Sequence, residues 1–320
     1  MTQAGLTSTN GSKTLSRPNN VQTEGNSALL PGSDKSMIHL ALPKGRMQEG
    51  VFKVLSDAGI QVRIGSRGYR PTLSLPGFET KILKPQNIVE MLHLGSRDIG
   101  FAGADWVKEL KADLVELLDT ELDPVRIVVA APKSLLVDGK LPAGRKLLVA
   151  SEYETLTKIW IKRSGIDATF VRSYGATEVF PPEDADIIVD NTATGATLEA
   201  NDLVIIDEVM KSSTRLYAHP AVVKNAAKME EINRVLMLMR SVLEARKRVM
   251  LEVNVTADKL ETLIAQLPSM REPTISPLHG ESGYAVKAAV PRKELPMLIP
   301  KLKAAGGTDV VVTGLSQIVP

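Results

Sequence analysis

The chain has 320 residues, of which 43% are hydrophobic and 24% are charged, as is ordinary for a globular protein. Its 39 lysines and arginines nearly balance its 37 aspartates and glutamates, so the net charge of +2 gives no chain-wide field to attract nucleic acid or an anionic membrane. The absence of cysteine excludes disulfides, thiolate catalysis and cysteine-based metal sites.

The N-terminal segment lacks the features of a targeting or membrane sequence. No apolar run approaches the roughly 20 residues that span a bilayer, and no basic patch precedes an apolar stretch. We therefore expect a cytoplasmic protein without a membrane partner. Residues 1–35 are rich in Ser, Thr, Asn and Gly and lack periodicity, which predicts a disordered tail. A transit peptide is the alternative, although Glu24 and Asp34 are unusual for one.

Strands and helices alternate from Met37 onward. The apolar segment 37–42 predicts a strand, and Pro43-Lys-Gly-Arg46 leads into a helix whose inner face carries Val51, Val54 and Leu55. Further strands are predicted over 80–84, 98–102, 125–131, 146–150, 168–172 and 185–190. Helices are predicted over 87–94 with Ile88, Met91 and Leu92 buried, from 104 onward, and over 153–164. This alternation predicts a parallel α/β sheet, in which ligands gather beyond the carboxyl ends of the strands.

The last quarter of the chain has a different pattern. A helix over 229–246 is predicted to bury Leu236, Met239, Val242 and Leu243. After it, strands over 249–255, 274–278, 284–290 and 309–313 and helices over 260–267 and 293–304 follow one another. Their βαββαβ order predicts a ferredoxin-like domain that could fold as a separate unit.

The segment after the predicted strand 185–190 carries the clearest functional pattern. Backbone N–H groups and hydroxyls at a helix start can hold a phosphate, Gly195 allows close approach of the anion, and Asp190 can accept hydrogen bonds from a sugar. An N-capped helix after an ordinary turn is the alternative. The candidate cradle consists of Asp190, Thr192, Ala193, Thr194, Gly195, Ala196 and Thr197.

Asp-x-x-x-Thr-Gly-x-Thr after an apolar strand resembles the phosphoribosyl-diphosphate loop of phosphoribosyltransferases. The run from Asp190 to Asn201 resembles the loop of ATP phosphoribosyltransferase, the first enzyme of histidine biosynthesis, and Asn191 follows Asp190 where purine and orotate enzymes carry a second acid. Residues 40–46, 98–105 and 212–216 agree with the same family in the same order. The similarity runs from about residue 37 to the end, and the family usually lacks the polar tail.

This resemblance implies two periplasmic-binding-protein-like lobes with mainly parallel sheets and a C-terminal ferredoxin-like regulatory domain of the family's long form. Catalytic lobe I is expected over 36–132 and about 217–246, lobe II with the loop over 133–216, and a histidine-binding domain over 247–320. The implied reaction joins N1 of the adenine of ATP to C1 of phosphoribosyl diphosphate and releases pyrophosphate. Histidine is the implied inhibitor, and the protein is expected to form homo-oligomers from dimer to hexamer.

The implied reaction needs positioning and charge stabilisation more than a nucleophile. Mg²⁺ is expected on the pyrophosphate, held mainly by substrate oxygens, so we predict no metal site built from protein side chains. No catalytic base is evident. Lys44 and Arg46 leave the first strand at its carboxyl end and are the electrostatic candidates, with a solvated basic turn as the alternative.

Three further positions are candidate substrate contacts. Arg67 could clamp a phosphate and Tyr69 could lie against a base, unless both belong to an exposed basic loop. Asp105 follows the predicted strand 98–102 and is either a substrate ligand or a helix N-cap. In the C-terminal hairpin, His279 and Ser276 could bind a histidine effector, with a solvated turn as the alternative.

Two other functions remain open at this point. A non-catalytic two-lobed solute-binding module with an amino-acid-sensing tail would have no need of the cradle at 194–197. A phosphoribosyltransferase that uses a free nucleobase would need the cradle but not ATP.

Overall fold

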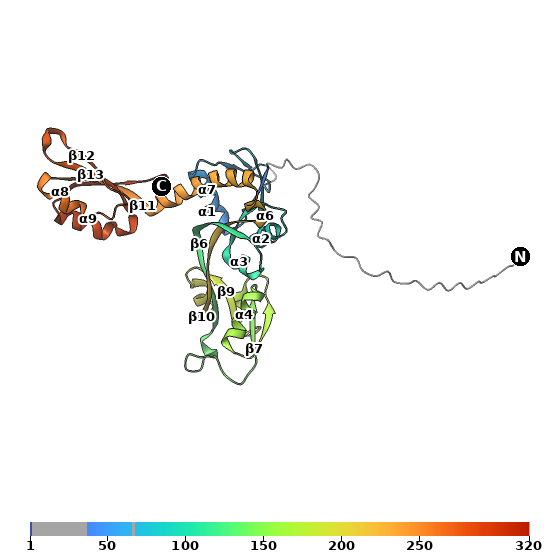
Figure 1. The fold of residues 1–320 in the computed structure, drawn as a ribbon. Coiled ribbons are helices and arrows are strands. Elements are labelled where there is room, and N and C mark those ends of the chain that lie inside the picture. Colours follow the sequence, from blue (N-terminus) through green and yellow to red (C-terminus); the bar gives the residue numbers. More distant parts are fainter. Residues whose placement is uncertain (2–36, 66–67, 320) are drawn as a thin grey trace. The chain divides into compact units, whose positions relative to one another are not determined.

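The computed structural model describes residues 1, 37–65 and 68–319. The predicted tail at 1–35 and the candidate Arg67 lie outside the described residues. Figure 1 shows the ribbon of the chain. Among the described helices, none is long and apolar enough to cross a membrane.

A large sheet passes through most of the described chain in the order β4-β1-β5-β10-β6-β9-β7-β8. The triplet β4-β1-β5 is parallel, and so is the triplet β9-β7-β8, as the alternation of strands and helices predicts. We call the first triplet with its helices lobe I and the second lobe II. The strands are β1 (Ile38–Pro43), β4 (Phe78–Leu83), β5 (Ile99–Gly103), β6 (Val115–Pro132), β7 (Leu147–Ser151), β8 (Ala168–Arg172), β9 (Ile187–Thr192) and β10 (Leu203–Ala218).

Two long antiparallel strands, β6 and β10, join the lobes. Residues 214–218 of β10 pair with β5 of lobe I, whereas residues 126–130 of β6 pair with β9 of lobe II. The pattern predicts only 125–131 of β6 and misses β10, since both strands are rich in charged and hydroxyl side chains. Their mutual pairing, interrupted by several register shifts, holds them extended where local propensity alone does not.

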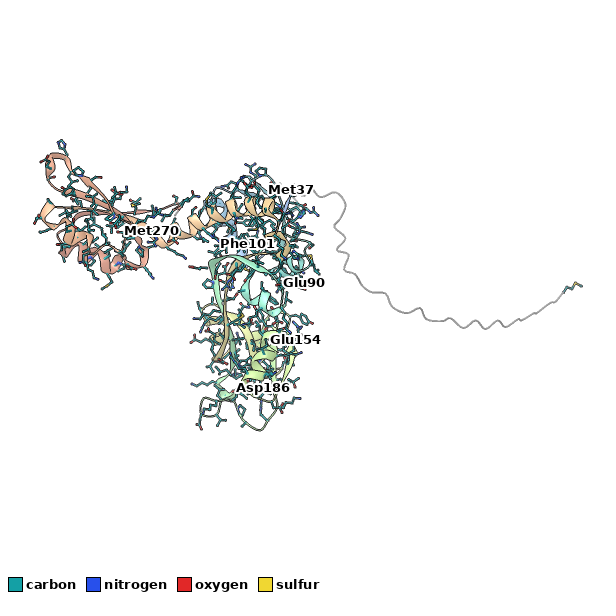
Figure 2. All side chains as sticks on the ribbon, in the orientation of Figure 1. Met37, Glu90, Phe101, Glu154, Asp186 and Met270 are labelled. Atoms are coloured by element: carbon teal, nitrogen blue, oxygen red, sulfur yellow. The ribbon has the colours of Figure 1, made fainter. Side chains whose placement is uncertain are left out.

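Helices cover the sheet where the apolar spacing predicts them. In lobe I, Val51, Val54 and Leu55 of α1 are buried as predicted, and Phe101 of β5 lies in the same core (Figure 2). The prediction for α2 is wrong at one position, because its buried stripe includes Val89 and leaves Met91 partly exposed. The helices are α1 (Arg46–Asp57), α2 (Pro85–His93), α3 (Ala104–Glu109), α4 (Glu154–Ser164), α5 (Ala196–Ala200), α6 (Pro220–Val223) and α7 (Ala226–Lys247).

The inner face of α7 is longer than predicted, and Leu243 is only half-buried there. Lobe I also contains a short hairpin of β2 (Val62–Arg63) and β3 (Thr72–Leu73). Short 3-10 turns complete the described chain, at Lys133–Leu135, Thr177–Val179, Ala257–Lys259, His279–Glu281 and Arg292–Glu294.

The C-terminal segment forms the predicted split βαβ arrangement. Its sheet has the order β12-β13-β11-β14 with antiparallel neighbours. Alternate residues of β11 point into a separate apolar core, which forms because helices cover only one face of this sheet. The elements are β11 (Arg248–Val255), α8 (Leu260–Ile264), β12 (Thr274–Pro277), β13 (Tyr284–Pro291), α9 (Leu295–Ala304) and β14 (Thr308–Gly314).

Candidate active site

Two threonine side chains accept hydrogen bonds from the backbone of the turn between β9 and α5. The backbone N–H of Gly195 donates to Thr192 Oγ1 over 2.8 Å, and the N–H of Ala196 donates to Thr194 Oγ1 over 3.3 Å. Gly195 has φ of 91°, in the left-handed region that favours glycine. Thr192 is buried, while Ala193, Thr194, Ala196 and Thr197 are exposed. The turn is therefore anchored at one residue and open to a ligand along the rest.

Asp190 lies half-buried at the start of this turn. Its Oδ1 accepts hydrogen bonds from the backbone N–H of Asn191 at 2.7 Å and from the Asn191 side-chain Nδ2 at 3.2 Å. Burial raises the pKa of Asp190 to about 6, against the opposing effect of the Asn191 N–H, and the negative charges of Glu178 and Glu152 add to the rise. At neutral pH the residue is an ionised acceptor held in an unfavourable environment.

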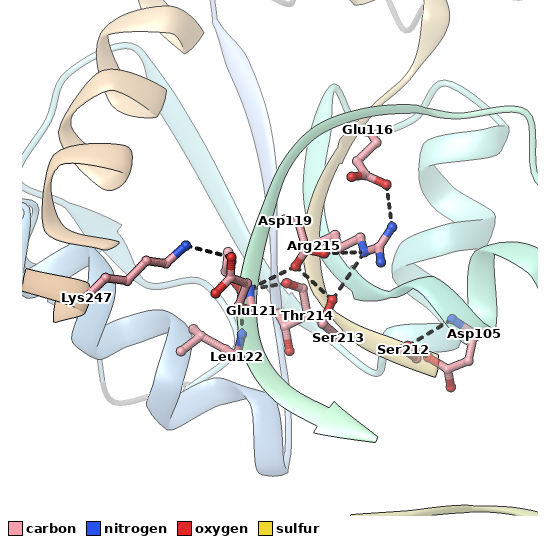
Figure 3. A network of polar contacts seen from close by, with 11 residues as sticks. Asp105, Glu116, Asp119, Glu121, Leu122, Ser212, Ser213, Thr214, Arg215 and Lys247 are labelled. Atoms are coloured by element: carbon pink, nitrogen blue, oxygen red, sulfur yellow. Dashed lines mark hydrogen bonds and ion pairs between the residues drawn. The ribbon is translucent and has the colours of Figure 1, made fainter. Parts of the chain in front are cut away.

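Asp105 belongs to a buried network rather than to a helix cap. The N-cap of α3 is Gly103, whereas Asp105 lies inside the first turn with 5% of its surface exposed. Ser212 Oγ donates to its Oδ1 over 2.6 Å, and the Tyr153 hydroxyl donates to its Oδ2 over 2.8 Å. The backbone N–H of Asp105 in turn donates to Ser212 Oγ, a contact drawn in Figure 3.

Tyr153 immediately precedes α4, and its side chain is buried against α3. Its ring centroid lies 4.8 Å from that of Trp106, with 31° between the planes. Its hydroxyl oxygen lies 3.3 Å from Nδ2 of Asn191, near the end of β9. Burial, followed by the negative charge of Asp105, raises the pKa of Tyr153 well above its ordinary value. The phenol therefore stays protonated at any working pH.

A small hollow of about 100 Å³ lies where the two lobes and the two joining strands meet. It is smaller than the few hundred Å³ that a nucleotide-sized ligand fills, so it is one recess of a larger surface site. It brings together two of the predicted residues, Arg46 and Asp105. Its lining consists of Arg46, Met47, Gly103, Asp105, Trp106, Asp123, Val125, Tyr153, Asn191, Ser212, Ser213 and Thr214.

Lys44 and Tyr69, both sequence candidates, lie together at the carboxyl end of β1. Lys44 Nζ lies 5.2 Å from the centroid of the Tyr69 ring, a cation–π distance. Tyr69 is 58% exposed, and Lys44 and Arg46 are also exposed. The basic turn and the aromatic ring are thus available to a ligand outside the hollow.

Arg215 lies on β10 within the crossing between the lobes. It donates to Glu116 Oε2 over 2.8 Å and lies 3.1 Å from Asp119 Oδ2, as Figure 3 shows. Burial lowers its pKa, but the hydrogen bond to Glu116 and the charge of Asp119 outweigh burial and raise the pKa above the ordinary value. With two carboxylates in contact, Arg215 stabilises the pairing of β6 and β10 and is not a free phosphate ligand.

Comparisons with known proteins agree with this architecture. Residues 84–241 match the sequence model described as HisG, ATP phosphoribosyltransferase, and residues 245–317 match that of the HisG C-terminal domain. An ATP phosphoribosyltransferase of Pelotomaculum thermopropionicum is 34% identical over 288 residues, which cover 88% of this chain and 99% of that protein. One of Natronomonas pharaonis is 37% identical over 290 residues, covering 88% and 100%. The chain belongs to the ATP phosphoribosyltransferase family.

It is therefore a pentosyltransferase of histidine biosynthesis, and the C-terminal domain makes it a long-form member. A solved structure agrees with the fold. The "ATP phosphoribosyl transferase (HisG:HisZ) complex from Thermotoga maritima" aligns with a TM-score of 0.56 and 26% identity over 64% of this chain and 99% of that chain. The predicted fold class, periplasmic-binding-protein-like lobes followed by a ferredoxin-like domain, is confirmed.

Several residues of this candidate site escape the sequence reasoning. Tyr153, Asn191 and Ser212 line the hollow. Tyr153 belongs to none of the motifs, and Asn191 and Ser212 lie within motifs that assign them no contact. Their position in the chain offers one usable signal. Tyr153 comes two residues after the end of β7, and Asn191 is the second-last residue of β9. The carboxyl ends of these neighbouring parallel strands meet at one edge.

The two sequence candidates for an effector site lie in the C-terminal domain. Ser276 is on β12 and His279 begins a short 3-10 turn, and both are exposed. The His279 carbonyl accepts a hydrogen bond from Ser282 Oγ over 3.3 Å. In the described hairpin no hydrogen bond joins the side chains of Ser276 and His279.

Proposed function

We propose that this chain joins N1 of the adenine of ATP to C1 of phosphoribosyl diphosphate and releases pyrophosphate, the first step of histidine biosynthesis. The observation that carries the proposal is the open turn at Gly195, which follows a half-buried aspartate at the carboxyl end of β9. Its exposed residues, which include the hydroxyl-bearing Thr194 and Thr197, suit a phosphate, and an ionised Asp190 suits the hydroxyls of the sugar.

The turn 192–197 binds the 5′-phosphate and Asp190 binds the ribose. Lys44 and Arg46 face the pyrophosphate or the triphosphate, and the Tyr69 ring lies against the adenine. In the reaction the N1 lone pair forms the bond to C1 while the bond between C1 and pyrophosphate breaks with its electrons on the leaving group. The adenine amino group then gives up a proton to solvent. The protein holds the reactants in line and stabilises separated charge.

Mg²⁺ is proposed to bind together with phosphoribosyl diphosphate. The carboxylates of Glu152 and Glu178 are close enough to Asp190 to raise its pKa, and carboxylate oxygens suit a hard cation. Substrate oxygens are proposed to supply most of its ligands, since Mg²⁺ usually binds through one or two carboxylates together with substrate phosphates. When bound, the ion neutralises charge on the pyrophosphate.

The test uses the purified full chain with ATP, phosphoribosyl diphosphate and Mg²⁺. We expect formation of phosphoribosyl-ATP, followed by its ultraviolet absorbance, and stoichiometric pyrophosphate. Free adenine, guanine or orotate in place of ATP serve as control acceptors and are expected to give no product. No turnover of ATP with both substrates intact, or faster turnover of a free base, contradicts the proposal.

Histidine is the proposed inhibitor, and it binds the C-terminal domain near His279 and Ser276. The enzyme is proposed to assemble from dimers to hexamers. It acts in the cytoplasm, where its phosphorylated substrates are found. The proposed division is lobe I over 36–132 and about 217–246, lobe II over 133–216 and the regulatory domain over 247–320. The separate apolar core of that domain supports a distinct effector site, as feedback between two sites requires.

Replacing His279 by alanine is expected to raise the histidine concentration for half-inhibition by about tenfold or more, because the bound effector loses one charge-assisted hydrogen bond. The kcat without histidine is expected to stay within twofold, because the residue is exposed and outside lobes I and II. A second variant, in which the chain ends at Lys247, is expected to lose inhibition by histidine. Inhibition that persists in an active truncated enzyme moves the effector site elsewhere.

A further inference from the structure

A continuous series of hydrogen bonds leads from the joining strand β10 to the carboxyl end of β9. Ser212 Oγ donates to Asp105 over 2.6 Å, and the Tyr153 hydroxyl donates to the other oxygen of Asp105 over 2.8 Å. Asn191 Nδ2 then lies 3.3 Å from the Tyr153 hydroxyl and 3.2 Å from Asp190 Oδ1. The series thus contains residues of lobe I, lobe II and the strand that joins them.

The direction of each hydrogen bond follows from the donors available. Ser212 Oγ already accepts from the Asp105 backbone N–H, so its own hydrogen goes to the carboxylate. The single hydrogen of the Tyr153 hydroxyl goes to the second carboxylate oxygen, which leaves that hydroxyl only as an acceptor toward Asn191. Asn191 must therefore present its NH₂ group, and not its carbonyl, to both Tyr153 and Asp190.

The inner end of the series is buried and the outer end is exposed. Tyr153 is 1% exposed and is stacked on Trp106, and Asp105 and Ser212 are each 5% exposed. Asn191 is exposed and lies next to the last residue of β9, so its side chain, and not its backbone, is the part that can turn. Without the Tyr153 hydroxyl, the Asn191 amide loses one of its two acceptors and can rotate away from the Asp190 carboxylate.

We infer that Tyr153 is a positioning residue for the phosphoribosyl-diphosphate site, acting through Asn191 to hold Asp190 in place. The inference rests on the proposed binding of the sugar donor by Asp190. It also gives a physical reason for asparagine at 191, where an acid could donate to neither Tyr153 nor Asp190. A carboxylate there would stand next to the Asp190 carboxylate with no hydrogen to share.

The test is a double-mutant cycle on the full-length enzyme. Tyr153→Phe and Asn191→Ala are each expected to raise the KM and Kd for phosphoribosyl diphosphate by about fivefold or more, the effect of one hydrogen bond, with the KM for ATP within about twofold. Because Tyr153 acts through Asn191, the double variant is expected to be no worse than Asn191→Ala alone. If the substitutions only disturbed the fold, both KM values would change, and the fold-changes of the two single variants would multiply in the double variant.

Thr157→Val is the matched control. Thr157 lies on α4, one turn beyond Tyr153, is 0% exposed, and its Oγ1 has no hydrogen-bond partner in the described chain. Removing this hydroxyl is expected to leave both KM values unchanged, so it measures the effect of losing any buried hydroxyl from this helix. Thermal unfolding of every variant reports whether the fold is kept.

Asn191→Asp provides a second route if Tyr153→Phe does not fold. It keeps the side-chain shape at an exposed position and leaves the Asp105–Tyr153 pair intact, but it removes both donor hydrogens. A rise in the KM for phosphoribosyl diphosphate of about fivefold or more is expected. Wild-type KM in Tyr153→Phe or in Asn191→Asp, or multiplying effects in the double variant, overturns the inference. An inactive wild-type enzyme would instead refute the proposed function.

Discussion

The Gly195→Val variant is expected to raise the KM for phosphoribosyl diphosphate by roughly tenfold to a hundredfold, because a left-handed backbone costs an L-residue about 1–2 kcal/mol and the loop loses its approach to the phosphate. Gly195 has φ of 91°. A Cβ built there meets only Ile205 Cδ1, at 3.8 Å, so the protein itself leaves room for a side chain. The valine would therefore occupy the space in front of the loop, where the ligand approaches.

Gly165→Val separates backbone strain from loss of the ligand site. Gly165 ends α4 in the same left-handed conformation, with φ of 71° and no atom within 4 Å of the built Cβ. Gly165→Val is expected to lower the unfolding temperature by about as much as Gly195→Val does, while the KM for phosphoribosyl diphosphate stays unchanged. Steady-state kinetics and thermal unfolding of both variants provide the comparison. A folded Gly195→Val enzyme with wild-type KM would refute the assignment of the phosphate site.

Local sequence was sufficient wherever a single element carries the information. The turn at 190–197 and the inner face of α1 follow from residues that are neighbours in the chain, and apolar periodicity reports burial directly. The exception in α2, where Val89 is buried instead of Met91, shows a limit of periodicity. Two adjacent apolar residues can both fit a helical stripe, and the packing surface decides between them.

The remainder of the site depends on partners that are distant in sequence. The Tyr153 hydroxyl meets Asp105 and Asn191, which are 48 and 38 positions away, and Arg215 meets Glu116 across 99 positions. Strand β10 is likewise held by pairing with β6, and its charged residues give no alternation to detect. Such contacts arise from the crossing of the two lobes, which no local pattern encodes.

Replacing Asp190 by asparagine is expected to weaken binding of phosphoribosyl diphosphate by roughly 10- to 100-fold, the effect of hydrogen bonds to a charged group. The same change is expected to stabilise the free protein above pH 6. Burial raises the pKa of Asp190 from 3.8 to about 6. The folded protein therefore binds more protons than the unfolded chain between these values, and the free energy of unfolding falls as pH rises through that window. Asparagine removes the penalty, which amounts to about 1–3 kcal/mol for this half-buried group.

Urea unfolding of both proteins from pH 4 to 8 measures this linkage. The variant is expected to be the more stable protein above pH 6, and the difference should shrink toward pH 4, where Asp190 is protonated in the folded wild type. Donor binding responds in the opposite sense, because protonation removes an acceptor and wild-type affinity falls below pH 6. The phosphate groups of the donor also titrate near pH 6, so Asp190→Asn supplies the baseline for their contribution. Equal stability of the two proteins at pH 8 would mean that Asp190 is not buried at a cost. Parallel pH profiles for binding would mean that Asp190 does not contact the sugar. Loss of binding together with a gain in stability would show that the carboxylate is kept at this position for function.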